Sequence, residues 1–460
     1  MQLVAYGAQD VYLTGNPQIT FFKVVYRRHT NFAMEAIENP FNGSPGFGKR
    51  VTCTIQRNGD LIHRMYLQAT LPSVALNATT DGSGAQFRWL NWVGHNLVDW
   101  VELQIGGQRI DKHYGDWLHI WNELTQEPGK QGGYAKMVGN GPQLTNLLVQ
   151  GGSGCENDCA AGEPLAAPEA LSCAPAYTLY IPLQFWFCRN PGLALPLIAL
   201  QYHEVRINLD FNDLRNLCWD ATPGAGSDPH AVRTRVAAAN LQAASLYVDY
   251  IYHDTDERRK FAQVSPEYLI ETLQFTGAES ITSSANKLKL NFNHPCKELV
   301  WVVQRDSFVS CDDAVVGEWK GQQPFNFSDW WDRCVHESGY SVTRVEGMAG
   351  KNPVVTALLQ LNGHDRFQTR EGDYFNLVQP YQHHTNCPAV GINVYSFALQ
   401  PEQHQPSGTC NLSRIDNTTL LLTVSNNAVG TSTSSSVYVF ATNYNVLRVM
   451  SGMGGLAYSN

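Results

Sequence analysis

The stretch LQIGGQRIDKHYGDW at residues 103–117 decides the fold of this chain, because a related stretch, LQLNGHDRFQTREGDY, recurs at residues 359–374. Both stretches open with Leu-Gln-aliphatic-x-Gly and close with Gly-Asp-aromatic, about half a chain apart. Upstream of each lies an apolar segment that ends in glutamine, at Gln68 and at Gln304. Similarity that recurs in the same order is the signature of a repeated structural unit. We therefore expect two copies of one fold.

Each copy is expected to be a β-sandwich. Short segments rich in Val, Ile, Tyr, Phe and Thr alternate apolar and polar residues between turn residues, which is typical of half-buried strands. The turn Asn362-Gly363 supplies the positive φ angles that sharp reversals need. The predicted strands are 20–26, 51–55, 63–71, 98–105, 177–187, 204–211 and 245–252 in the first half, and 287–292, 299–304, 354–361, 391–399, 420–424 and 437–443 in the second.

Helices are predicted to be few. Residues 116–124 carry Trp117, Trp121 and Leu124 at helical spacing, and residues 256–263 form a charge-rich helix with acidic residues in the first turn and basic residues later. The second helix is interpreted as a linker and not as a catalytic carboxylate pair. It sets the expected domain organisation: an N-terminal arm at 1–20, a first sandwich at 21–255, the linker helix at 256–265 and a second sandwich at 266–460.

Two long segments of low periodicity are expected to be exposed loops. Residues 126–176 are dense in Gly, Pro, Ala and Cys, and residues 312–353 contain Trp319, Trp330 and Trp331. Long loops on a rigid sandwich usually carry function. The three tryptophans are expected to anchor the second loop on its sandwich. A carbohydrate-binding platform at Trp330-Trp331 is the alternative.

Composition limits the partners and the compartment. The chain has 460 residues, of which 43% are hydrophobic and 16% charged, and its net charge is 32 − 41 = −9. A negative surface repels phosphate, so direct binding of nucleic acid is not expected. Residues 1–10 do not read as a secretory signal, and the apolar run at 193–200 is far shorter than the roughly 20 residues that span a bilayer. Synthesis in a cytoplasm is expected.

No catalytic, cofactor-binding or metal-binding residue is predicted. The sequence lacks the common hydrolase, metalloprotease and phosphate-binding motifs, and Gly106-Gly107 is interpreted as a turn. His383-His384 and His203-Glu204 are expected to be ordinary hydrogen-bonding residues, because neighbours on a strand point to opposite faces. A metal-dependent jelly-roll enzyme is the alternative.

The eleven cysteines are mostly expected to be buried thiols. Cys155, Cys159 and Cys173 lie close together in sequence and leave a disulfide or a zinc site open, although their spacing matches no common zinc pattern. The one basic cluster near the N-terminus is Lys23, Arg27, Arg28 and His29. Two interpretations of this cluster stay open: it binds an acidic partner or lipid headgroups, or it is a solvated or salt-bridged strand end.

Several longer motifs resemble one protein family. They are LVAYGAQDVYLTGNPQITFFKVVYRRHTNFAMEAI at the N-terminus, IGGQRID from Ile105, GLALPLIALQYHEVRI from Gly192, YIYHDTDERRKFAQ from Tyr250, YSFALQPEQHQPSGTCNLSRIDN from Tyr395 and NYNVLRVMSGMGGLAYSN at the C-terminus. Together they resemble the major capsid proteins of nucleocytoplasmic large DNA viruses, in particular the phycodnavirus and marseillevirus branch. The resemblance runs from the first residues to the last, with departures in the long loops.

The resemblance implies an all-β tandem double jelly roll, with two eight-stranded sandwiches, and a structural role without enzymatic activity. It implies a homotrimer that forms a pseudo-hexagonal capsomer and tiles the icosahedral shell of a large double-stranded DNA virus. The partners would be neighbouring capsomers, minor capsid proteins and penton proteins. The arm would face inward, toward minor proteins or the inner viral membrane, and the long loops outward. The protein would be made late, in the host cytoplasm, and reside in the virion.

Overall fold

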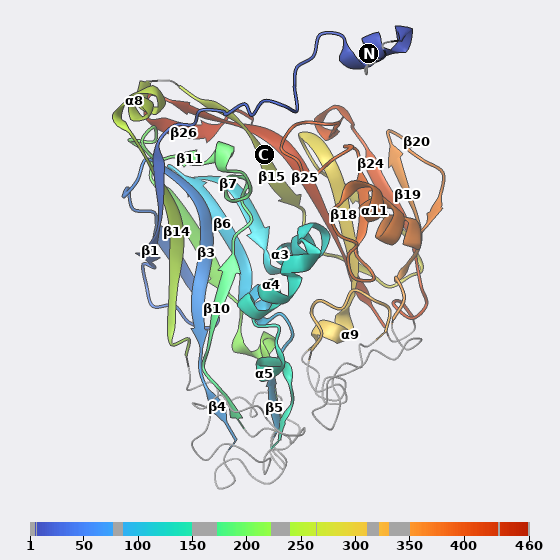
Figure 1. The fold of residues 1–460 in the computed structure, drawn as a ribbon. Coiled ribbons are helices and arrows are strands. Elements are labelled where there is room, and N and C mark those ends of the chain that lie inside the picture. The colour runs from blue at the N-terminus through green and yellow to red at the C-terminus, as the bar shows by residue number, and fades with distance from the viewer. Residues whose placement is uncertain are drawn as a thin grey trace.

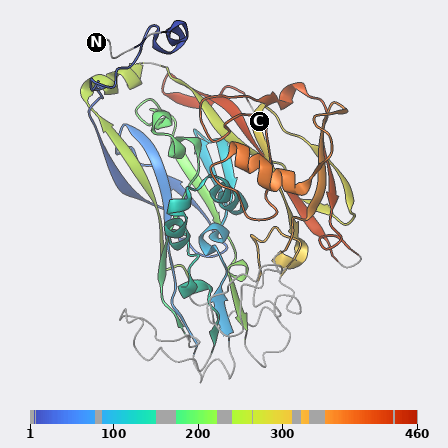
Figure 2. The same cartoon turned by 45° about the vertical axis from the view of Figure 1, so that its right-hand side comes forward.

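The computed structural model describes residues 5, 7–76, 86–149, 173–221, 240–263, 265–310, 322–330, 350–430 and 433–458. Antiparallel strands dominate these residues, and two sandwiches stand side by side, as Figures 1 and 2 show. The expected all-β tandem double jelly roll is confirmed.

In the first jelly roll, two sheets enclose the core. The order along one sheet is β1-β14-β3-β10, and along the other β2-β12-β6-β7. The strands are β1 (Phe32–Pro40), β2 (Arg50–Thr54), β3 (Leu61–Leu71), β6 (Val98–Ile105), β7 (Gln108–Tyr114), β10 (Tyr177–Pro182), β12 (Val205–Phe211) and β14 (Ala243–His253). Alternate residues of β3, from Met65 to Leu71, are buried, which is the period-2 burial that the sequence predicts.

The second jelly roll repeats this plan strand for strand. Its sheets run β15-β25-β18-β22 and β17-β24-β19-β20. The strands are β15 (Glu267–Phe275), β17 (Ala285–Leu290), β18 (Pro295–Arg305), β19 (Val354–Leu361), β20 (His364–Asp365), β22 (Asn393–Ser396), β24 (Thr418–Val424) and β25 (Ser435–Met450). Taken in chain order, each of these eight strands occupies the place of its counterpart in the first jelly roll.

The repeated motif forms the same hairpin in both halves. Gly106 and Gly107 join β6 to β7 with φ angles of 59° and 83°, and Asn362 and Gly363 join β19 to β20 with φ angles of 51° and 81°. Two successive residues with positive φ make the tight turn that matches the twist of paired strands. The equivalence of Gly107 and Gly363 is therefore confirmed.

Short helices lie at the edges of the sandwiches. Helix α3 (Gly115–Thr125) follows the first hairpin, and a π-helical turn, η6 (Tyr374–Val378), with α11 (Gln379–His383) follows the second. Helix α8 (Thr255–Gln263) joins the two halves at the upper end in Figure 1, close to the arm. No helix among the described residues is both long enough and apolar enough to cross a membrane.

The chain ends by returning to the first jelly roll. Ile270 on β15 and Leu447 and Val449 at the end of β25 are buried in the core of the first sandwich. Strand β26 (Met453–Leu456) pairs with β25, and Gly454 lies against Leu200. The second half of the chain therefore contributes side chains to the core of the first sandwich as well as forming its own. The sequence pattern did not show this, because it indicates which face of a strand is apolar but not which core receives that face.

Residues 20–26 are not a strand, in contrast to the prediction. They have no sheet partner in the part of the chain that the structure describes, and β1 begins only at Phe32, where β14 pairs with it. Their alternating pattern indicated apolar faces, but a strand also needs a neighbour to accept its backbone hydrogen bonds. The arm that precedes the sheets therefore extends to Asn31.

The predicted exposed loops are partly folded. Within 126–176, α4 (Gln131–Met137) and α5 (Pro142–Thr145) carry Tyr134 and Leu144, which are buried, so this part is not an exposed loop. The sequence did not predict these helices, because their buried apolar residues are too few to produce a helical periodicity. Within 312–353, Phe327 is buried in the core between the jelly rolls. Residues 150–172, 311–321 and 331–349 lie outside the described residues, together with Trp319 and Trp331.

Candidate functional site: the junction of the jelly rolls and the N-terminal arm

Helix α3 fills the junction between the jelly rolls. Trp117, Trp121 and Leu124 recur at helical spacing, as the sequence predicts, and all are buried. They pack in one cluster with residues from the sheet of the second jelly roll, including Val300 on β18 and Phe440 on β25. Trp117 and Phe440 lie with their ring centres 5.4 Å apart. The helix belongs to the first half of the chain but buries its apolar face against the second.

A buried ion cluster centred on Glu271 crosses the same junction. Its Oε2 accepts a hydrogen bond from Nη1 of Arg189 at 3.1 Å, and its Oε1 lies 2.8 Å from Nζ of Lys297 and 3.5 Å from Nδ1 of His404. Burial alone would raise the pKa of Glu271, but the hydrogen bond from His404 and the charges of Arg189 and Lys297 lower it to about 2. Arg189 also stacks on Trp121 at 4.2 Å, so the charged cluster and the apolar cluster form one contact.

Backbone groups complete the junction. Asp111 on β7 accepts a hydrogen bond from the N–H of Leu273 at 3.0 Å and lies 3.0 Å from His113. Near the C-terminal end of α3, the N–H of Asn386 donates to the carbonyl of Leu124 at 3.0 Å. These hydrogen bonds help to fix the position of one jelly roll against the other. Each of them satisfies a polar group that the contact removes from water.

A second buried charge cluster lies inside the second jelly roll. Nε2 of His384 lies 2.9 Å from Oε2 of Glu298, and its Nδ1 lies 2.9 Å from Oε1 of Glu402. The side chains of His384 and Glu298 are 0% exposed. Burial by itself would lower the pKa of His384, but the two carboxylates raise it to about 9. The imidazolium is held between two carboxylates and ties the end of α11 to β18.

The histidines of the two sequence pairs each lie beside a polar group of the chain. His383 lies on α11, not on a strand, and its Nδ1 lies 3.0 Å from the carbonyl of Leu399. His203 lies 2.9 Å from the carbonyl of Gly454, where the returning C-terminal strand meets the first jelly roll. Among the described residues, no group of three or more His, Cys, Asp or Glu has an arrangement that could hold a metal ion.

One of the described cysteines forms a disulfide bond. Cys173 is disulfide-bonded, and Cys155 and Cys159 lie outside the described residues. Cys53, Cys188 and Cys296 are buried free thiols and Cys218 is buried as well, while Cys387 is exposed and Cys410 partly exposed. Trp330, the described member of the candidate sugar platform, is 43% exposed.

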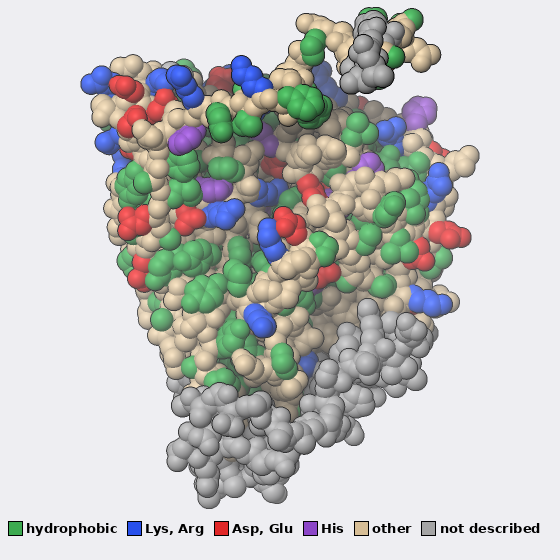
Figure 3. All heavy atoms as spheres, in the orientation of Figure 1, with side chains coloured by type: hydrophobic (Ala, Val, Ile, Leu, Met, Phe, Trp, Pro, Cys, Tyr) green, Lys and Arg blue, Asp and Glu red, His purple; other side chains and the backbone are tan. Residues whose placement is uncertain are grey.

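The N-terminal arm exposes large apolar side chains. Tyr12, Phe21 and Phe22 are 91%, 87% and 99% exposed, and the arm leaves the body at its upper end in Figure 1. Figure 3 shows Lys and Arg side chains gathered along that edge. Lys23 and Arg27 and their neighbours Arg28 and His29 are exposed as well. Contiguous exposed apolar groups of this kind mark a contact surface.

The ion cluster around Glu271 was not predicted from the sequence. Glu271, Arg189, Lys297 and His404 are scattered over more than 200 residues and carry no motif. The one available signal was charge inside apolar strands, since Lys297 and Glu298 interrupt the apolar pattern of β18. Such residues are rarely buried unless they are paired.

The chain was compared with known families, curated proteins and solved structures. Residues 20–254 match the family described as "Major capsid protein N-terminus", and residues 257–455 match "Large eukaryotic DNA virus major capsid protein". The major capsid protein of Phaeocystis pouchetii virus is 52% identical, with 100% of this chain and 99% of that protein covered. The major capsid protein of Paramecium bursaria Chlorella virus 1 is 40% identical over the same shares.

Solved structures agree. A chain of a quasi-atomic model of the PBCV-1 virus capsid has a TM-score of 0.69 and 36% identity, with 96% of this chain and 100% of that chain covered. The Faustovirus major capsid protein has a TM-score of 0.71 at 14% identity, with 97% and 94% covered, and so supports the fold alone. These relatives are structural proteins and not enzymes. The chain belongs to the family of major capsid proteins of large eukaryotic DNA viruses.

Proposed function

We propose that three copies of this chain form a pseudo-hexagonal capsomer that tiles the icosahedral shell of a large double-stranded DNA virus. The observation that carries the proposal is the strand-for-strand equivalence of the two jelly rolls. Three chains around a threefold axis present six similar blocks, so their outline approximates a hexagon. The similarity to a chain of the PBCV-1 capsid supports the same assembly.

The test is the mass and outline of the purified protein. Light scattering should give about 150 kDa, three times the 51.2 kDa of one chain. Electron micrographs should show hexagonal particles. A stable monomer at micromolar concentration would contradict the proposal.

The surface around α11 is the candidate contact between copies. Leu377, Val378, Tyr381 and Leu399 are large apolar side chains that remain exposed, and Tyr381 is 80% exposed. The hydrogen bond between His383 and the carbonyl of Leu399 holds the helix against that segment. We expect the double variant Tyr381→Glu/Leu399→Glu to weaken self-association or capsomer packing, and Lys287→Glu, on an exposed position of β17, to leave both unchanged. Equal assembly of the two variants would exclude this surface.

The arm is the candidate contact with the interior of the shell, either with minor capsid proteins or with the inner viral membrane. From Val11 to Met34 the sequence has Lys23, Arg27 and Arg28 and no Asp or Glu. Exposed apolar groups next to exposed cations suit an anionic lipid surface as well as an acidic protein.

Deletion of residues 2–31 separates these roles. The shortened chain should still form trimers, because β1 begins after the deletion. It should lose flotation with vesicles that contain anionic lipid, if the membrane is the partner, or lose capture of minor capsid proteins in shell reconstitution. A shortened chain that retains both activities would show that the arm makes neither contact. Contacts with penton proteins and with neighbouring capsomers, and late synthesis in the host cytoplasm, belong to the same proposal.

A further inference from the structure

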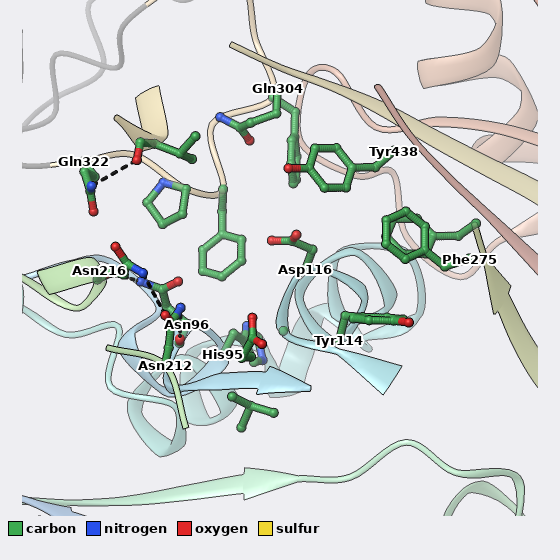
Figure 4. A pocket seen from close by; sticks show the side chains of 18 residues that line it. His95, Asn96, Tyr114, Asp116, Asn212, Asn216, Phe275, Gln304, Gln322 and Tyr438 are labelled. Atoms are coloured by element: carbon green, nitrogen blue, oxygen red, sulfur yellow. Dashed lines mark hydrogen bonds between the residues drawn. The ribbon is translucent and has the colours of Figure 1, made fainter. Parts of the chain in front are cut away.

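A cavity of about 330 Å³ lies at the junction of the two jelly rolls, beside α3. Its volume is in the range of small-molecule sites. Both halves of the chain line it: His95, Tyr114 and Asp116 come from the first, and Gln304 and Tyr438 from the second. Figure 4 shows these side chains around one central space. None of the comparisons assigns a ligand to it.

Aromatic rings form much of the wall. They come from three separate segments of the second half and from the end of β7 in the first. The rings are Tyr114, Phe275, Phe325, Phe327, Tyr438 and Phe440. The face of an aromatic ring is electron-rich and attracts cations, and several rings around one point form the cage that binds alkylammonium groups.

One carboxylate points into this cage. Figure 4 places Asp116 between Tyr438 and Tyr114, with its carboxylate directed into the cavity. Asp99 lies at the rim and is exposed. No Lys or Arg occurs among the described residues of the lining, so neither carboxylate has a cationic side chain inside the cavity.

Two further buried groups lack a partner. Oε1 of Gln304 and Nδ1 of His95 make no hydrogen bond to any described residue, although these side chains are 3% and 0% exposed. Both residues line the cavity. Burial, reinforced by His119, keeps the pKa of His95 well below its usual value, so this histidine is neutral and adds no positive charge. A buried acceptor left unpaired costs free energy unless a ligand or water satisfies it.

We propose that this cavity binds a small alkylammonium cation, whose charge meets Asp116, whose methyl or methylene groups lie against the aromatic rings, and whose polar hydrogen is accepted by Gln304. The occupant contacts both jelly rolls at once. Its binding therefore stabilises the junction, in addition to the contacts of α3 and Glu271.

The site has a defined pH dependence. Burial and the neighbouring Asp99 raise the pKa of Asp116 to about 6. Because the cation needs the ionised carboxylate, affinity should be constant above pH 7 and about tenfold weaker at pH 5. The other titratable groups that line the cavity with Asp116 are Asp99, His95, Tyr114 and Tyr438. The charged or titratable groups that act on these include His119 on His95, Asp306 on Tyr438, and Lys112 and Arg50 on Asp99.

The experiment is calorimetric titration of the assembled full-length protein at pH 7.5 with two probes, choline and 1,4-diaminobutane, at matched ionic strength. At least one probe should bind saturably and raise the unfolding temperature. The neutral isostere of choline, 3,3-dimethyl-1-butanol, should bind at least about tenfold more weakly, because it lacks the charge. Absence of binding by both cations, or equal binding of the neutral isostere, would overturn the proposal.

Two variants locate the site. Asp116→Asn keeps the shape of the side chain and should weaken binding at least about tenfold, while Asp365→Asn, on exposed β20, should bind as the parent protein does. Phe325→Leu keeps the carboxylate and removes one ring, so it should weaken binding by a smaller factor even if Asp116→Asn does not fold. Unchanged affinity in a folded Asp116→Asn or in Phe325→Leu would place the cation elsewhere and overturn the proposal.

Discussion

Gly115 and Gly372 occupy the same place in the two jelly rolls, each pressed against the carbonyl oxygen of the residue that begins the preceding long strand. For Gly115 that residue is Val98, the first of β6, and for Gly372 it is Val354, the first of β19. A Cβ atom at either position would overlap that oxygen. Both glycines belong to the Gly-Asp-aromatic close of the repeated motif, which therefore marks a close approach of two backbone segments.

Alanine at either position should be severely destabilising. Because the clash is with backbone and not with a movable side chain, we expect Gly115→Ala and Gly372→Ala each to cost more than about 3 kcal/mol, or to abolish soluble expression. Gly132→Ala, at a helical glycine with open space around it, is the matched control. Thermal unfolding of the three variants checks this. A soluble Gly372→Ala protein with a normal unfolding temperature would contradict the close packing.

The turn glycines should behave differently. Gly107 and Gly363 have positive φ angles, but a Cβ atom at either one would meet nothing within 4 Å. Only backbone strain is therefore added by Gly107→Val and Gly363→Val, about 1 to 3 kcal/mol each. The two losses of stability should be similar, because the hairpins are equivalent. A large loss at one position and none at the other, measured by thermal unfolding, would show that the turns are not equivalent.

Neutralising Glu271 should break the junction. The change Glu271→Gln leaves Lys297, whose side chain is 1% exposed, without its carboxylate partner, and Arg189 without its own. Removing one member of a buried ion cluster costs about 3 to 5 kcal/mol. The control is Glu267→Gln on the same strand, where the pair with Arg448 is about half exposed and contributes less than about 1 kcal/mol. Equal unfolding temperatures for these two variants would refute a stabilising role of the cluster.

The cluster around His384 predicts loss of stability at alkaline pH. Its pKa is raised to about 9 in the folded protein, above the ordinary value of 6.5. The stabilisation is therefore fully present below pH 6.5 and is lost as pH rises through 9, and its full size is about 3 kcal/mol. Unfolding temperature should fall between pH 6.5 and 9.5. The fall should be shallower in Glu402→Gln than in the parent, and unchanged in the control Glu371→Gln on the exposed β21 (Arg370–Glu371). Parallel curves for all three would exclude His384 as the cause.

Periodic features of the fold could be predicted from the sequence. Strand β6 at residues 98–105 and β19 at residues 354–361 have the predicted bounds, because alternation of apolar residues reports burial of one face. The helix with Trp117 and Trp121 was predicted for the same reason. The repeat predicted that one fold is used twice, since two similar motifs recur at half-chain spacing.

Features that depend on distant partners could not be predicted. Residues 20–26 have the composition of a strand but pair with no strand among the described residues. The cavity at Asp116 collects rings from residues such as Phe275 and Phe440, which no local pattern connects. The sequence favoured a strand for the histidine pair at 383–384, whereas His383 lies on helix α11. This helix is hard to predict, because it is short, contains Pro380 and has few strong helix formers.

The return of the last strand to the first jelly roll has a consequence for synthesis. Leu447, Val449 and Gly454 are synthesised after all eight strands of the first jelly roll, yet Leu447 and Val449 are buried in its core and Gly454 lies against Leu200. Part of the first core therefore stays uncovered until β25 has been made, although domains usually fold as they emerge. A chain that stops before β25 is complete lacks Leu447 and Val449 in that core. Completion of the first core is thus coupled to synthesis of the second jelly roll.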